Sequence, residues 1–67
     1  MHNAYAFVPT HRLVDDEGNT VDERLMHEGR FFDRYTWEHG GRALTLEEAT
    51  EWGYKLEPIV GKRQRVG

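Results

Sequence analysis

Four histidines are the first candidates for chemistry, since imidazole is a common metal ligand: His2, His11, His27 and His39. Their spacings match neither a helical HxxxH motif nor a zinc finger. In the hairpin register given below, Glu23 lies across from His11, on the same face as His27, so these three side chains could converge. A metal site needs three or four converging ligands with supporting partners. We therefore interpret the histidines as surface or rim residues, and predict no metal and no cofactor.

Paired carboxylates are the second candidate, because Asp15-Asp16 and Glu47-Glu48 could supply acid–base catalysis. Each pair also has a structural explanation, in a turn or at a helix start, and adjacent side chains point in different directions. The chain has no Ser and no Cys, and it contains neither a G-x-S-x-G elbow nor a glycine-rich phosphate loop. We predict that the chain is not an enzyme; a small metal-dependent enzyme is the least supported alternative.

A basic segment, 62–67, holds three cations within four positions: Lys62, Arg63 and Arg65. These side chains could contact phosphate or an acidic partner surface, or they could simply keep the chain solvated. The formal net charge is −3, which gives no overall reason to expect binding to nucleic acid. A nucleic-acid-associated regulator that uses this segment is therefore the second interpretation of the chain.

Aromatic residues supply the predicted core and a predicted partner surface. Phe31, Tyr35 and Trp37 share one face of a strand and are expected to be buried. A second, partly apolar face is predicted to bind a partner, with an exposed aromatic beside an arginine as its anchor. The residues predicted for that face are Val8, Val14, Met26, Phe32 and Arg34.

A β-hairpin must position these residues. Acidic turn residues followed by Gly18, with β-formers on both sides, predict a loop at 16–18 with Gly18 in the left-handed region. The loop sets a register in which Asp15 faces Asn19, Leu13 faces Val21 and Arg12 faces Asp22. Segment 22–28 is read as the second arm, although one helical turn there stays open.

Two further elements complete the predicted fold. Residues 30–38 alternate with a period of two and are rich in aromatics, which predicts a strand. Thr45 with Glu48 three positions later forms a capping box, and Gly53 is a typical helix stop, so we expect one helix at about 46–52. Segment 54–60 is extended, and Pro58 places it at a sheet edge.

Length and composition limit the folds and functions that the chain can have. Sixty-seven residues suffice for one domain, predicted at 1–61 and followed by the basic tail, with little room for a deep substrate cavity. The expected class is α+β, a small antiparallel sheet of three to four strands with one short helix packed on it. The absence of cysteine and of a long apolar run favours the cytoplasm or the inside of an assembly such as a virion.

The favoured interpretation is a small non-enzymatic module for protein–protein interaction or assembly. Accessory subunits of a larger complex, for example a phage particle, fit this description, and so do inhibitors or adaptors of host machinery. The expected partner is another protein or a second copy of the chain; nucleic acid is the lesser alternative, and no membrane is expected.

Overall fold

A computed structural model describes residues 6–60 and contains five strands and two short helices. The class is α+β, mostly sheet, with more strands than the three to four predicted and a second helix. The elements in chain order are β1 (His11–Val14), β2 (Thr20–His27), β3 (Arg30–Phe32), α1 (Arg34–His39), β4 (Leu44–Thr45), α2 (Leu46–Glu51) and β5 (Lys55–Pro58). The predicted basic tail, and with it the domain boundary at residue 61, lies outside the described residues.

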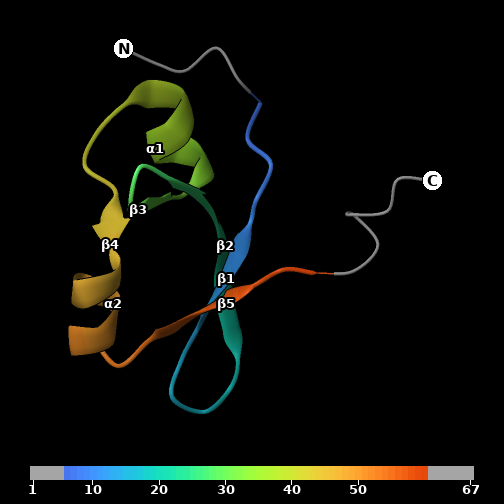
Figure 1. Ribbon diagram of the computed structural model, residues 1–67, viewed down its shortest axis with the longest axis vertical. Coiled ribbons are helices and arrows are strands. Elements are labelled where there is room, and N and C mark those ends of the chain that lie inside the picture. The colour runs from blue at the N-terminus through green and yellow to red at the C-terminus, as the bar shows by residue number, and fades with distance from the viewer. Residues whose placement is uncertain (1–5, 61–67) are drawn as a thin grey trace.

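The sheet is antiparallel throughout, in the order β4-β3-β2-β1-β5, and it curls. Its two edge strands are joined through α2, which contacts both β4 and β5. In Figure 1 the strands and α2 therefore run around a central space, while α1 lies at the end of the molecule opposite the hairpin loop. The last extended segment is confirmed as an edge strand, because within residues 6–60 β5 pairs with β1 alone.

The hairpin loop forms as predicted. Gly18 has a φ of +87°, in the region that favours glycine. The backbone amide of Asp15 donates to the carbonyl of Asn19 over 2.9 Å, and Oδ1 of Asp15 accepts from the amides of Glu17 and Asn19. Residues 22–27 of the segment for which a helical turn stayed open belong to strand β2, and Glu28 lies in the turn that follows it. The acidic turn therefore has the structural role that the sequence indicated.

The predicted hairpin register is wrong beyond the loop. Val14 faces Thr20, as predicted, but Leu13 faces Asp22 and Arg12 faces Glu23. Val21 is thus an extra residue on β2, a β-bulge that shifts the register by one position. Val21 therefore does not face the buried Leu13, as the predicted register had it, and its side chain is exposed.

The predicted aromatic strand 30–38 is also corrected. Pairing with β2 ends at Phe32, and the chain turns into helix α1 directly after it. Asp33 is the N-cap, with Oδ1 accepting from the amide of Thr36 at 3.2 Å. Trp37 is buried at 3% exposure, as expected of a core residue, but Tyr35 is 68% exposed and is not.

Helix α2 has the ends that the sequence predicts. Thr45 and Glu48 form the complete capping box. At the other end Gly53 has a φ of +89°, its amide donates to Thr50, and the amide of Tyr54 donates to Ala49. This pair of bonds is a Schellman motif, which stops the helix after two turns.

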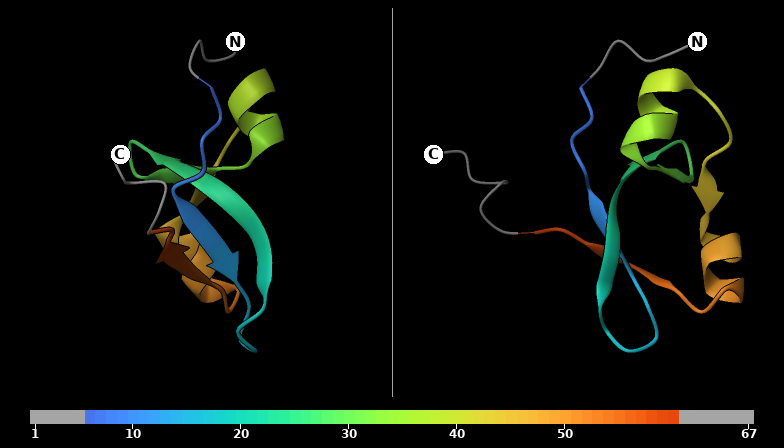
Figure 2. Two further views of the ribbon diagram at one scale, coloured as in Figure 1. Left: turned by 90° about the vertical axis from the view of Figure 1, so that its right-hand side faces the viewer. Right: turned by 180° about the vertical axis from the view of Figure 1, so that it is seen from behind.

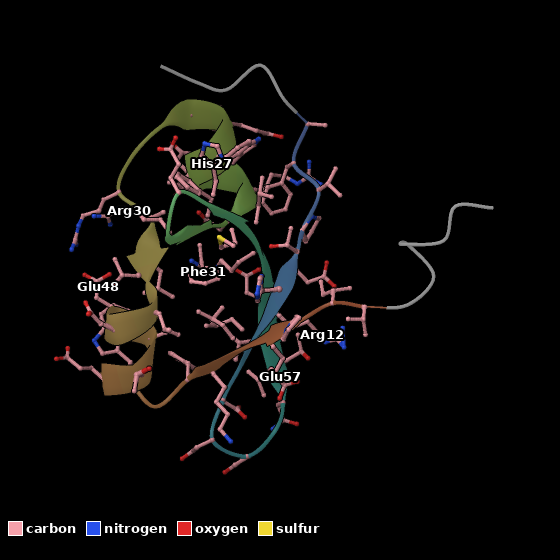
Figure 3. The ribbon with its side chains drawn as sticks, viewed as in Figure 1. Arg12, His27, Arg30, Phe31, Glu48 and Glu57 are labelled. Carbon is pink, nitrogen blue, oxygen red and sulfur yellow. The ribbon has the colours of Figure 1, made fainter. Side chains whose placement is uncertain are left out.

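The main core fills the inner face of the curled sheet. Leu13, Leu44 and Ala49 are buried together, with Tyr54 and Leu56 packed against them. Phe31 faces Leu44 across β3 and β4, and its side chain points into the central space (Figure 3). Ala49 thus ties α2 to the sheet. Among residues 6–60 no helix is long and apolar enough to span a membrane.

Candidate functional site

An open cavity of about 410 Å³ lies on the inner side of the curled sheet, between β2 and α2. This volume lies within the range of ligand pockets. Three of its lining residues, Leu13, Ala43 and Leu44, are buried and form an apolar floor. The lining residues are Leu13, Val21, Arg24, Arg42, Ala43, Leu44, Glu48, Trp52 and Tyr54.

Trp52 stands at the rim of the cavity and is 66% exposed. It is the C-cap of α2, where its backbone amide closes the last turn on Glu48 and Ala49. The Schellman motif then returns Tyr54 to the core, on the far side of the same rim. The end of α2 therefore holds the Trp52 indole beside the cavity, and this side chain is not part of the core.

Arg24 forms part of the wall from strand β2, and its side chain is only 19% exposed. Its Nε donates to Oδ2 of Asp22 at 3.0 Å, and an Nη donates a longer bond of 3.4 Å to the carbonyl of Phe31. Its charge also helps to lower the pKa of Asp33, the N-cap of α1. These contacts fix the guanidinium in place.

Arg42 reaches the opposite rim and donates to Oε2 of Glu48. The other oxygen of Glu48 accepts from the Thr45 amide at 3.1 Å, so one carboxylate both caps α2 and holds Arg42. The Thr45 amide, with Arg42 beside it, lowers the pKa of Glu48, which keeps this carboxylate ionised at neutral pH. The capping box thus positions the second arginine.

A second hollow of about 470 Å³ lies beside the first, on the other side of Val21. Although larger, it has no buried residue in its lining, and it is bordered by Asp22, Glu23, Phe7 and Arg34. We take the smaller cavity as the candidate site, because a buried apolar floor is what holds a ligand away from water.

The predicted partner face does not form as one surface. Met26 faces Phe31 and Leu25 faces Phe32, so Met26 and Phe32 point to opposite sides of the sheet. Val14 is buried at 3% exposure, and Phe32 is half-buried against Trp37, with ring centroids 5.2 Å apart.

The remaining members of that predicted face are exposed but separate. Val8 precedes the sheet, and Arg34 starts α1, where it pairs with Glu38 at 3.3 Å and lies over the ring of Phe7. Partner binding by these residues stays a prediction, but no single face carries it. The tail residues Lys62, Arg63 and Arg65 lie outside the described residues.

His11, Glu23 and His27 do not converge, and His2 lies outside the described residues. The bulge places His11 opposite Arg24, so Glu23 and His27 point to the other side of the sheet. His11 packs edge-on against Phe31 on one side, and His27 packs against Trp37 on the other. Figure 3 shows His27 at the α1 end of the molecule, away from Phe31. In the described part of the chain no group of three or more acidic or histidine side chains could hold a metal ion.

Comparisons with known proteins do not assign the cavity. No protein-family model matches the chain, and neither curated proteins nor solved structures give a match. The case for a function therefore rests on the residues of the chain itself.

Sequence reasoning missed the arginines of this site, and no local signal marks them. Arg24 and Arg42 are 18 positions apart in the sequence, and the curled sheet brings both to the lining of one cavity. Trp52 did carry a signal in the sequence. It lies three positions after Ala49, on the same side of α2, and the small Ala49 is the residue that this helix buries. A tryptophan there extends past the core towards solvent.

Proposed function

We propose that this chain is a small non-enzymatic protein-interaction module, and that the cavity receives an apolar side chain of its partner. The observation that carries the proposal is Trp52, a large aromatic held two-thirds exposed at the rim of an apolar-floored cavity. We place such a module in the cytoplasm or inside a larger assembly, as an accessory subunit, for example of a phage particle, or as an inhibitor or adaptor of host machinery.

The residue types around the cavity support this proposal. Tryptophan, tyrosine and arginine are the types that dominate the binding energy of protein interfaces, and Trp52, Tyr54, Arg24 and Arg42 all line the cavity. Interface energy concentrates where such residues surround a pocket that excludes water. A cavity with a buried floor and an aromatic rim offers that arrangement.

The state of Glu48 favours binding over catalysis. It is the one carboxylate in the cavity lining, and both of its oxygens are engaged, by the Thr45 amide and by Arg42. The Thr45 amide and Arg42 lower the pKa of Glu48 from its ordinary value, and a carboxylate with a lowered pKa is a weaker base. Glu48 thus suits a positioning role better than acid–base work.

Selection from a random peptide library tests the proposal. The wild-type chain is the bait, and the affinity of each selected peptide is then measured for wild type and for Trp52→Ala. Trp52→Ala is expected to stay folded because the side chain is mostly exposed. Tyr35→Ala, an equally exposed aromatic on α1, is the matched control and should retain the selected peptides.

We expect peptides whose binding weakens at least about tenfold in Trp52→Ala, as for an interface hot spot. Peptides that bind both variants equally, or the recovery of no peptide that depends on Trp52, would contradict the proposal. Salt-sensitive binding of duplex or single-stranded nucleic acid that is lost on deletion of 62–67 would instead favour the regulator interpretation.

A further inference from the structure

We infer that the partner is an acidic segment, one that places a carboxylate directly beside the large apolar side chain that enters the cavity. This inference rests on the proposed function and names the chemistry of the partner. Charge, the placement of two arginines and the shape of the cavity carry it.

The cavity is a positive site in a negative domain. Residues 6–60 contain six cations, Arg12, Arg24, Arg30, Arg34, Arg42 and Lys55, against all twelve acidic residues of the chain, so their formal charge is 6 − 12 = −6. The cavity lining itself holds two of those cations and a single carboxylate, and Asp22 pairs with Arg24 from outside the lining. A partner with an anionic group is therefore repelled by the net charge of this domain, and it meets less repulsion at the cavity lining, where the Arg42 side chain is 70% exposed.

Both arginines are held in place yet keep donors for a ligand. A guanidinium has five N–H donors. Within residues 6–60, Arg42 donates to Glu48 alone, and Arg24 donates to Asp22 and to the carbonyl of Phe31. The remaining donors of Arg42 face solvent, because its side chain is 70% exposed. Fixed guanidinium groups bind carboxylates with little loss of side-chain entropy.

The partner must supply an apolar side chain because of the cavity walls between the two arginines. Val21 and Trp52 are exposed at the rim, over the buried floor of Leu13 and Leu44. A cavity of about 410 Å³ accommodates one large aliphatic or aromatic side chain and a short length of backbone. An acidic side chain next to that anchor then reaches Arg42 at the rim.

The same charges disfavour the two other occupants that the chain itself offers. The segment 62–67 carries three cations and no acidic residue, so it does not complement a positive cavity. A second copy of the chain brings a formal net charge of −3 against −3. The complement is an acidic partner with a local apolar anchor.

The peptide selection also tests this inference, through the composition of the peptides that depend on Trp52. We expect Asp or Glu next to the aromatic or aliphatic anchor. Replacing that acidic residue by Gln or Asn should weaken binding about three- to tenfold at low salt, and less at high salt. Neutral or basic residues beside the anchor would overturn the inference and leave the proposed function standing, whereas the absence of Trp52-dependent peptides would overturn both.

Arg42→Gln gives the reciprocal test on the protein. It should weaken the acidic peptides about three- to tenfold and leave their neutral analogues unchanged. Arg34→Gln is the matched control, because Arg34 is an exposed arginine with its own glutamate partner outside the cavity, and it should bind like wild type. Equal weakening of acidic and neutral peptides by Arg42→Gln, or concentration-dependent self-association through Trp52, would overturn the acidic partner.

Discussion

The two helices have the same length but are specified by different interactions. Both α1 and α2 are six residues long, and each begins with a side-chain N-cap and buries a single residue. α2 has reciprocal capping bonds at its start and a Schellman motif at its end, while its buried residue is the small Ala49. α1 has a one-way cap from Asp33, and its buried residue is Trp37. Local bonds therefore specify α2, whereas one large side chain specifies α1.

Figure 2 shows the consequence for the molecule. α2 lies along the open side of the curled sheet, where it joins β4 to β5, and α1 sits apart from it at the other end. The helix with strong local signals holds the candidate site, and the helix with weak signals covers the opposite side of β2 and β3 through Trp37. Three measurements on folding stability sharpen this contrast.

The largest expected effect separates the two tryptophans. Trp37→Ala should lower the free energy of unfolding by about 3–5 kcal/mol, because it empties a buried contact with Phe32 and His27. Trp52→Ala should cost less than about 0.5 kcal/mol, because its ring is mostly in solvent. Urea unfolding monitored by circular dichroism measures both, and similar losses for the two variants would show that α1 is not held by its anchor.

The next effect concerns the N-caps. Thr45→Ala and Asp33→Ala should each lower the free energy of unfolding by about 1 kcal/mol, the usual cost of a lost cap. Thr50→Ala is the control within α2, since its hydroxyl bonds back to the Leu46 carbonyl at an exposed position and caps nothing. Thermal melting of the three variants measures these differences in stability. A Thr45→Ala variant as stable as Thr50→Ala would contradict the capping box.

The smallest effect is a dependence on pH. Partial burial raises the pKa of Asp33, but hydrogen bonds from Thr36 and the charge of Arg24 outweigh it, so the pKa is lowered. The Thr45 amide lowers the pKa of Glu48. A carboxylate with a lowered folded pKa stabilises the fold above its ordinary pKa, near 3.8 for Asp and 4.5 for Glu, and loses that contribution as pH falls.

The measurement compares urea midpoints at pH 7 and pH 3 for wild type, Asp33→Asn and Glu48→Gln. Wild type should lose stability at pH 3, and each variant should lose less than wild type does, since one titrating cap has been removed. The amide side chains still cap, so the folds should persist. Variants that follow the wild-type change with pH would show that these carboxylates do not couple to folding.

Sequence patterns were sufficient where hydrogen bonds are local. The loop at Gly18, the capping box of Thr45 and Glu48, and the Gly53 stop each involve residues at most a few positions apart, and all three are confirmed. The edge strand β5 also follows from its extended composition and Pro58. These features need no knowledge of what the segment packs against.

Sequence patterns gave wrong predictions where a second structural pattern fits the same residues. Phe31, Asp33, Tyr35 and Trp37 alternate as in a strand, but Asp33 and Thr36 also stand at the spacing of an N-cap and the backbone amide that donates to it. The packing of Trp37 on Phe32 and His27 decided for the helix. The bulge at Val21 likewise has no glycine to mark it, and it moved every pairing beyond Val14 by one residue.

The sequence by itself determined an acidic, cysteine-free α+β chain with one hairpin loop and one well-capped helix, because composition and local hydrogen bonds are written in neighbouring residues. Only the tertiary structure decided the curl of the sheet, the second helix and the cavity between Arg24, Arg42 and Trp52. Burial and charge in a cavity depend on contacts between segments that are distant in the sequence. The bulge and the Trp37 contact, which bring these segments together, are set by packing.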